Sequence, residues 1–480
     1  MKTPPPRTPP RIAVVGHTNT GKTSLLRTLL RDAAFGDVSD RPATTRHSEA
    51  AELSVESSSL ILTDTPGLED SSGLLEYLES ITLEQGGDQH ERIVRWLADH
   101  QGHFSQEAKA VRQVLECDVA IYVIDARERM LGRHRDELTV LSWCARPLVP
   151  VLNFVASAEV DVPSWRDQLA RLGLHAVVAF DTVIVEESSE RQLLEVLRTL
   201  VPKHEATFDG FMLGRSRQRV ELVRASALLI ADMLIDAAAC VLHVDPKNEE
   251  SLRHGVETLR TALRAREQRC AEQLMALHRF RGEDRIDDDL PGVDGRWGLD
   301  LFHPAAVKQF GAATGRGAAV GAMAGLAIDA LVGGMTLGAA AATGAGVGAL
   351  FETARGHGRR WLRRARGETE LRADDSTIHL LALRAISLAR ALLGRGHAAQ
   401  APVRVAHDSL LGRVRTAART ASGWSMPKPL QSARLSRRWS SLGTDGASAA
   451  DPRRAEAVFE VSRLVTERLV KRANEPTQFP

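Results

Sequence analysis

Cysteine is scarce in this chain, and the four cysteines lie far apart in the sequence. They are Cys117, Cys144, Cys240 and Cys270, and no two of them form a C-x-x-C pair. This spacing argues against a disulfide framework or a zinc site. It indicates reduced thiols in a cytosolic protein.

The chain also lacks an excess of charge of either sign. Its 480 residues include 62 Lys and Arg against 61 Asp and Glu. Overall charge therefore predicts neither nucleic-acid nor membrane binding, and charged partners have to be inferred from local clusters. A chain of this length exceeds one ordinary hydrophobic core, so we expect two or three domains.

An apolar leader segment and a hydrolase triad are missing as well. Residues 1–10 are rich in proline and hold no apolar run, so we expect a disordered lead-in rather than a signal peptide. We also find no Ser/His/Asp constellation and no repeat of long period.

The most informative stretch that is present begins at Arg11. The apolar run Ile12–Val15 leads into G-H-T-N-T-G-K-T, and an amphipathic helical pattern follows at once. The glycines of such a loop let backbone N–H groups surround phosphate oxygens, the lysine meets the outer phosphates, and the hydroxyl after it meets Mg²⁺. The residues expected to bind nucleotide here are Gly16, Asn19, Thr20, Gly21, Lys22, Thr23 and Ser24.

A second nucleotide motif follows about forty residues later. The apolar strand Leu60–Thr63 runs into Asp64-Thr65-Pro66-Gly67. An aspartate at the end of a buried strand, followed by a glycine whose N–H faces the terminal phosphate, is typical of P-loop NTPases. Strands then alternate with helices as far as residue 201, which predicts a parallel sheet covered on both faces. We therefore expect an α/β P-loop NTPase domain over 11–203, with a helical insert at 68–116.

Residues 10–202 resemble GTPases of the translation-factor-related class, closest to the TrmE, Era and EngA group. The resemblance rests on the P-loop asparagine Asn19, a Thr-Thr-Arg loop at 44–46 and the D-T-P-G. It implies that GTP, GDP and Mg²⁺ are the ligands. It also implies that Thr45, or else Thr44, and Asp64 reach Mg²⁺, and that Gly67 bonds the γ-phosphate. The expected catalytic set consists of Lys22, Thr45 and Gly67. The alternative is an ATPase of another P-loop branch.

Two departures from that group concern base recognition and hydrolysis. The guanine-reading N-K-x-D is replaced by Asn153-Phe154-Val155-Ala156, so the carboxylate that accepts from guanine is missing. Asp181, in the fifth motif, either replaces that acceptor or caps the end of a strand. Leu68 stands where many GTPases carry a water-orienting glutamine. By resemblance, Asn19 would hold a K⁺ ion that assists hydrolysis; the alternative is a hydrogen bond that stabilises the loop.

The second half of the chain is expected to be all-helical, over 208–400, with no strands. Long helices are predicted at 214–243, 246–280 and 376–395. Residues 401–450 are rich in Ser, Arg and Gly and are interpreted as a basic linker. A C-terminal helix is expected over 451–474, beginning at Asp451-Pro452.

Small residues recur every fourth position within 311–351, which places them on one helix face and predicts a Gly/Ala-rich helical hairpin. Arginines follow between 355 and 366. Two interpretations stay open: insertion into a membrane with anionic headgroups, or a buried hairpin inside a helical bundle. This GTPase-plus-helical arrangement also resembles a bacterial family of GTPases with a C-terminal domain of unknown function.

These observations lead to one functional hypothesis and two rivals. The hypothesis is a cytoplasmic GTP-binding switch, with slow K⁺-stimulated hydrolysis and moving segments at 36–48 and 64–75. It acts at the inner face of the plasma membrane, with a homodimer through the GTPase domain as a further expectation. The rivals are a ribosome- or RNA-associated assembly GTPase and a nucleotide-gated scaffold. The absence of a KH-type motif and of a strongly basic domain argues against nucleic acid.

Overall fold

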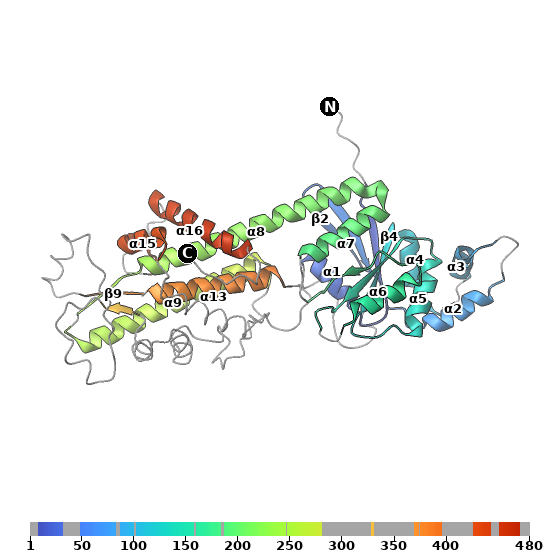
Figure 1. The fold of residues 1–480 in the computed structure, drawn as a ribbon, viewed down its shortest axis with the longest axis horizontal. Helices are drawn as coiled ribbons and strands as arrows, with labels where there is room; N and C mark the ends of the chain where they lie inside the picture. The colour runs from blue at the N-terminus through green and yellow to red at the C-terminus, as the bar shows by residue number, and fades with distance from the viewer. Residues whose placement is uncertain are drawn as a thin grey trace, which may run out of the picture. The chain divides into compact units, whose positions relative to one another are not determined.

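In the computed structural model the chain forms two compact units, the first built mainly from residues up to Arg219 and the second mainly from Val220 onward (Figure 1). The structure describes residues 8–31, 49–82, 87–99, 102–157, 160–183, 187–245, 247–280, 328–330, 369–373, 375–395, 426–442 and 451–470.

The first unit is built on a six-stranded sheet. Its strands, in spatial order, are β2 (Glu49–Val55), β3 (Ser58–Asp64), β1 (Arg11–Val15), β4 (Val119–Asp125), β5 (Leu148–Asn153) and β6 (Val178–Ala179). The edge strand β2 is antiparallel to β3, and all other neighbours are parallel. The carboxyl ends of the five parallel strands therefore meet at one edge, where open α/β sheets bind ligands.

Alternating side chains explain why helices cover both faces of this sheet. In β1, Ile12 and Val14 pack on one face, whereas Ala13 and Val15 pack on the other. Parallel strands buried on both sides need helices in two layers. One layer consists of α1 (Lys22–Leu30), α7 (Glu187–Leu200) and the start of α8 (Glu205–Ala239); the other includes α4 (Ser105–Glu116), α5 (Gly132–Ser142) and α6 (Val162–Ala170).

The predicted helical insert contains two further helices, α2 (Ser71–Ser80) and α3 (Gln89–Ala98), in addition to α4. Their starts are set by aspartates. Asp70 accepts a hydrogen bond from the backbone N–H of Gly73, and Asp88 accepts one from Glu91, each at 3.0 Å. Such N-caps stabilise a helix by about 1 kcal/mol.

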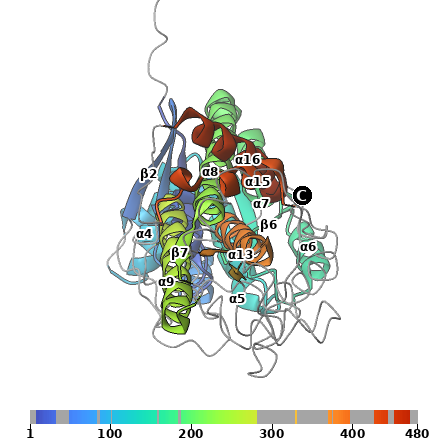
Figure 2. The ribbon, with the colours of Figure 1, turned by 90° about the vertical axis from the view of Figure 1, so that its left-hand side faces the viewer.

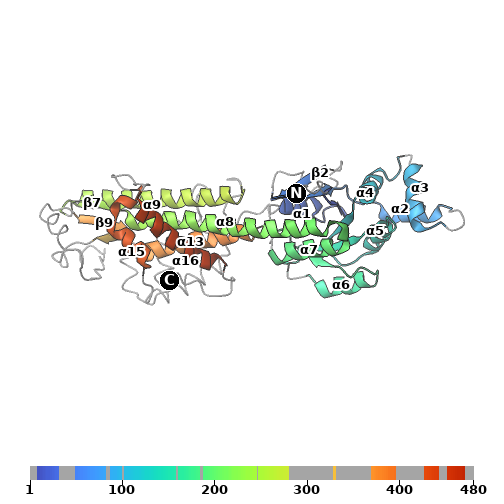
Figure 3. The same cartoon turned by 90° about the horizontal axis from the view of Figure 1, so that it is seen from above.

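The second unit packs helices around a core of its own. They are the later part of α8, α9 (Glu249–Leu277), α13 (Asp375–Leu393), α15 (Lys428–Leu435) and α16 (Pro452–Val470). Helices α9 and α13 pack against each other (Figure 1), Figure 2 shows α9, α13 and α16 around α8, and Figure 3 shows the same helices from above. Ion pairs are buried in this unit: Arg266 contacts Asp236 at 2.8 Å and Arg384 contacts Glu267 at 2.6 Å.

The expectation that the second half has no strands was wrong. A three-stranded antiparallel sheet lies there, in the order β7 (Leu242–Val244), β9 (Thr369–Ala373) and β8 (Ile328–Ala330). Strands of three to five residues are too short to give a clear alternating pattern. In β9 the alternation is visible in the burial of the side chains, since Leu371 and Ala373 are buried and Arg372 is half-buried.

The predicted glycine-rich hairpin coincides with the described residues only at Ile328–Ala330, where the structure has the strand β8 instead of a helix. The rest of 311–351 and the arginines of 355–366 lie outside the described residues. Among the helices that the structure describes, none has both the length and the apolar character needed to cross a bilayer.

The interpretation of 401–450 as a linker was wrong at residues 428–442. Helix α15 and a short 3₁₀ turn at Arg437–Trp439 lie there, and they bury Leu430, Ala433 and Trp439 in the core of the second unit. The indole N–H of Trp439 donates to Asp451 at 2.7 Å. A few apolar residues among many Ser and Arg residues are enough to order this segment. The average composition of the segment does not reveal them.

Candidate nucleotide site

The P-loop between β1 and α1 has a backbone that only glycine accommodates at two positions. Gly16 has φ +144° and Gly21 has φ +92°. A Cβ on Gly16 would lie 2.5 Å from the carbonyl oxygen of Val123, and one on Gly21 would lie 2.3 Å from Asn153 Nδ2. The loop is therefore held tightly against β4 and β5, with the positive N-terminal end of α1 behind it.

Lys22 is buried in this loop and folded back on it. Its ammonium donates to the carbonyl oxygens of Gly16 at 3.1 Å and His17 at 2.7 Å. Burial lowers the pKa of Lys22, and the nearby Asp64 carboxylate opposes that shift. A phosphate anion beside the loop would offer this ammonium a stronger partner than two neutral carbonyls.

Thr23 and Asp64 come together at the end of β3. The Thr23 hydroxyl donates to Asp64 Oδ2 at 2.6 Å, and both residues are buried. The adjacent strands fix this geometry, because Asp64 lies opposite Val14 in the register of β1 and β3. A hydroxyl and a carboxylate oxygen are the hard ligands that Mg²⁺ prefers, so this pair fits a magnesium ion bound with a nucleotide.

Gly67 approaches the P-loop from the other side. A Cβ there would lie 2.5 Å from Thr18 Oγ1 and 3.0 Å from the Thr18 nitrogen. Thr18 Oγ1 is buried and has no hydrogen-bond partner among the described residues. The side chain of Leu68 is fully buried in the apolar core beneath. It therefore lies away from solvent and orients no water.

The remaining predicted P-loop residues differ in exposure. The Thr20 hydroxyl donates to the His17 carbonyl at 3.0 Å, and Ser24 lies half-buried in the first turn of α1. Asn19 is exposed in the left-handed conformation, with φ +65°. Its side chain makes no hydrogen bond with a described residue, so the loop-stabilising alternative finds no support here. Thr44 and Thr45 lie outside the described residues, as does Arg46.

Asn153 joins three segments of the site. Its Nδ2 donates to the carbonyl of Thr20 at 3.0 Å, and its Oδ1 accepts the backbone N–H groups of Phe154 at 2.9 Å and Thr182 at 3.0 Å. The side chain is fully buried. Through this one amide, the ends of β5 and β6 are tied to the P-loop.

Asp181 and Phe154 lie at the same edge of the sheet. The Asp181 carboxylate accepts the backbone N–H groups of Ala156 at 3.0 Å and Val183 at 2.8 Å, and so caps both loops. Phe154 has φ +59°, and its ring lies close to Gly21 on one side. The guanidinium of Arg127 lies 4.2 Å from the centre of this ring.

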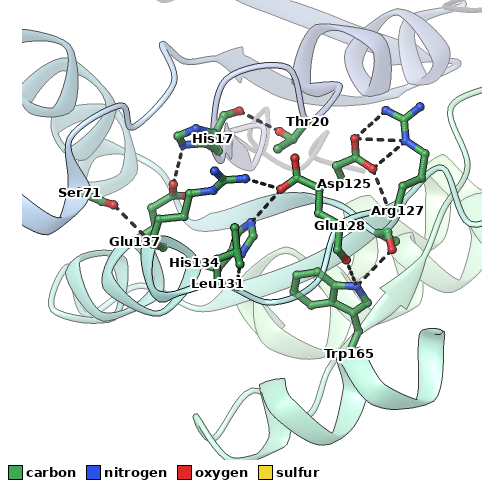
Figure 4. A network of polar contacts seen from close by, with 12 residues as sticks. His17, Thr20, Ser71, Asp125, Arg127, Glu128, Leu131, His134, Glu137 and Trp165 are labelled. Carbon is green, nitrogen blue, oxygen red and sulfur yellow. Dashed lines mark hydrogen bonds and ion pairs between the residues drawn. The ribbon is translucent and has the colours of Figure 1, made fainter. Parts of the chain in front are cut away.

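A partly buried network beside the P-loop was not predicted from the sequence (Figure 4). His17 Nδ1 lies 2.9 Å from Glu137 Oε1 and 3.0 Å from the Leu68 carbonyl. The other Glu137 oxygen accepts from the hydroxyl of Tyr122 at 2.7 Å. The hydrogen bond to Glu137 raises the pKa of His17, and burial raises the pKa of Tyr122.

The residues after Leu68 are also held by a buried carboxylate. Glu107 of α4 accepts the backbone N–H groups of Glu69 at 3.1 Å and Asp70 at 3.0 Å. Its side chain is 5 % exposed. Glu107 and Glu137 resemble ordinary charged residues on amphipathic helices, so no sequence pattern marks them.

Comparison with known proteins matches the two halves of the chain to different family models. The model described as 50S ribosome-binding GTPase matches residues 11–154, and the model described as Domain of unknown function (DUF3482) matches residues 166–463. The predicted resemblance to the TrmE, Era and EngA group is confirmed by the first match and by the relatives below.

Among curated proteins, GTPase Der of Stenotrophomonas maltophilia is 24 % identical over 212 residues, covering 44 % of this chain and 40 % of Der. The tRNA modification GTPase MnmE of Synechocystis is 26 % identical over 194 residues, covering 39 % of this chain and 36 % of MnmE. GTPase Era of Trichlorobacter lovleyi is 23 % identical over 240 residues, covering 48 % of this chain and 69 % of Era. The matched region spans less than half the length of Der and MnmE.

Solved structures of Era are also similar to part of the chain. An Aquifex aeolicus Era variant bound to GDP.AlF4⁻ is 19 % identical, with a TM-score of 0.30, and the match covers 46 % of this chain and 67 % of Era. Era in complex with MgGDPNP and a segment of 16S ribosomal RNA is 19 % identical, with a TM-score of 0.31, and the match covers 46 % of this chain and 66 % of Era.

Proposed function

The chain belongs to the family described as DUF3482, and we propose that it is a GTP-binding switch that hydrolyses GTP slowly. The single observation that carries the proposal is the meeting of the P-loop lysine with the Thr23–Asp64 pair at one edge of the sheet. This arrangement supports the proposal, because backbone N–H groups, an ammonium and two hard oxygen ligands are the groups that a magnesium–triphosphate needs.

The roles of the individual residues follow from their contacts. Lys22 exchanges its two carbonyl partners for the outer phosphates when nucleotide binds. Thr23, Asp64 and Thr45 would hold Mg²⁺, with Asp64 acting through water. The metal would supply positive charge to offset the negative charge that develops on the phosphates. The Gly67 N–H donates to the γ-phosphate.

Hydrolysis is slow because Leu68 is buried and no glutamine follows Gly67. The exposed Asn19 side chain supports a role for K⁺, since its amide oxygen is available to a monovalent ion beside the phosphates. We propose that a K⁺ ion held by Asn19 would supply positive charge beside the phosphates, where it would stabilise the negative charge that develops during hydrolysis without a water-orienting glutamine.

The γ-phosphate acts on the switch through the segment after Gly67. In the structure this segment is held by His17 at the Leu68 carbonyl and by Glu107 at two backbone N–H groups. Movement of Gly67 toward a γ-phosphate pulls against these bonds and passes the change to α4 and α5. Ordering of 36–48 by Thr45 would accompany it.

The switch has three candidate outputs. We propose action in the cytoplasm, with contact to the inner face of the plasma membrane through the basic and glycine-rich residues of 311–366 and dimerisation through the GTPase domain. The second candidate, ribosome association, is favoured by the description of the family model that matches 11–154. Flotation with anionic liposomes and co-sedimentation with ribosomes distinguish the two outputs. The third candidate is a scaffold that hydrolyses almost no GTP.

Single-turnover hydrolysis of GTP with Mg²⁺ tests the enzymatic proposal. The rate in K⁺ is expected to exceed the rate in Na⁺ by about tenfold or more, and Asn19→Ala is expected to abolish that difference. Asn248→Ala is the matched control, since Asn248 caps α9 in the other unit. Lys22→Ala should abolish binding. A rate that is equally low in both salts, with GTP bound, would favour the scaffold.

A further inference from the structure

We propose that Asp181 reads the guanine base, in place of the aspartate that the sequence lacks after Asn153. The proposal rests on the proposed function, because it concerns the base end of the same nucleotide site. It assigns a specificity-determining residue that belongs to a different strand from the usual reader.

The position of the carboxylate is the first observation. Ala156 stands at the fourth place of Asn153-Phe154-Val155-Ala156, where N-K-x-D supplies its aspartate. Asp181 Oδ2 accepts the backbone N–H of that same Ala156 at 3.0 Å. A carboxylate from the end of the neighbouring strand therefore lies within one hydrogen bond of the position where the usual aspartate is missing.

The carboxylate is also fixed in relation to the phosphate cradle. Asp181 is 7 % exposed, and its Oδ1 accepts the backbone N–H of Val183 at 2.8 Å. The next residue, Thr182, donates its N–H to Asn153, whose amide in turn holds the carbonyl of Thr20 in the P-loop. A base-reading group has to be held at a constant distance from the phosphates, and this chain of hydrogen bonds provides that rigidity.

The chemistry of a carboxylate selects guanine among the purines. An ionised carboxylate only accepts hydrogen bonds and offers about four lone-pair positions. Guanine presents two adjacent donors, N1–H and the 2-amino group. Adenine presents an acceptor at N1 and no donor at C2, and xanthine replaces the 2-amino group by an acceptor oxygen. A buried reader left facing an acceptor loses its partner and rejects that base.

Another carboxylate at this edge is paired with a guanidinium and serves as a matched control. Asp125, which ends β4, forms a two-point ion pair with Arg127, with contacts between 2.6 and 3.3 Å. Its register partner is Asn153 on β5, so it lies near the same loop. Because its oxygens face a guanidinium, Asp125 is not expected to read the base.

The test is equilibrium binding of GTP, ITP, XTP and ATP to the full chain with Mg²⁺, for the native protein, Asp181→Asn and Asp125→Asn. The side-chain amide of Asp181→Asn can donate to the 2-oxo group of xanthine. We expect Asp181→Asn to lower GTP affinity at least tenfold and to raise XTP affinity at least tenfold, whereas Asp125→Asn leaves the ratio unchanged. Equal weakening of all four nucleotides would mean that Asp181 only caps the loops, and the proposal would be overturned.

A measurement on the native protein keeps the proposal falsifiable even where Asp181→Asn fails to fold. The expected order of affinity is GTP, then ITP, which lacks the 2-amino donor, then XTP. Equal affinities for the three would overturn the inference while leaving nucleotide binding intact. Failure of the proposed function is distinguishable, because then none of the triphosphates would bind to the folded protein.

Discussion

Truncation of Asn153 to alanine is the perturbation whose effect the structure specifies most completely. The side chain is fully buried and makes three hydrogen bonds, to the P-loop carbonyl of Thr20 and to the backbone N–H groups of Phe154 and Thr182. Each net bond contributes about 1 kcal/mol, so Asn153→Ala should destabilise the first unit by about 3 kcal/mol. For a unit of this size, that corresponds to a fall in melting temperature of about 6–12 °C.

The same substitution should weaken nucleotide binding, because it releases the P-loop from β5 and β6. We expect GTP affinity to fall by about tenfold or more, since the loop then has to be ordered when the ligand binds. Thermal unfolding followed by circular dichroism measures the first effect, and calorimetric titration with GTP and Mg²⁺ measures the second.

Asn248→Ala is the matched control for this pair of measurements. Asn248 caps α9 in the second unit, with its Oδ1 accepting the N–H groups of Glu250 and Ser251. Its loss should cost about 1 kcal/mol and leave nucleotide affinity unchanged. The reasoning would be refuted if Asn153→Ala lowered GTP affinity no more than Asn248→Ala does.

Three further predictions concern the switch segment and two histidines. Gly67→Ala puts a Cβ against Thr18, so single-turnover GTP hydrolysis should fall about 100-fold while GDP affinity stays nearly constant; an unchanged rate would contradict the placement of Gly67. Glu137 raises the pKa of His17, so the protonated histidine stabilises the folded state at pH values below the pKa of His17 in the unfolded chain, and this stabilisation is lost as pH rises through the pKa in the folded state. The melting temperature of the first unit should therefore fall as pH rises through that folded-state pKa, and His17→Gln should remove this pH dependence. Burial lowers the pKa of His379 from 6.5 to about 4, so the second unit should lose about 3 kcal/mol as pH falls across that interval, and chemical unfolding of His379→Leu should show no such loss.

The phosphate end of the site is predictable from the sequence because its determinants are local. Gly16, Gly21 and Lys22 act through a loop of eight residues, and the alternation of apolar residues in β1 already implies helices on both faces of the sheet. Asp64 lies far along the chain from this loop, but a strand that ends in D-T-P-G identifies it. In each case the spacing itself carries the physical requirement.

The contacts that hold the switch segment are not predictable in the same way. Glu107 and Glu137 lie on helices whose patterns look amphipathic, and only the tertiary structure brings their carboxylates to the backbone after Gly67 and to His17. In the second unit, Trp439 is buried in the core although the segment that contains it has the composition of a linker. Short strands such as β7 fail for a related reason, since three residues carry no measurable period.

Calorimetric titration of the full chain with GTP and with ATP, both with Mg²⁺, tests directly whether the P-loop binds GTP. We expect binding of GTP, at least about tenfold weaker binding of ATP, and no binding of either nucleotide to a folded Lys22→Ala variant. Equal affinities would contradict guanine recognition and leave a P-loop protein that does not read the base. Absence of binding to the folded native protein would contradict both the nucleotide site and the proposed switch.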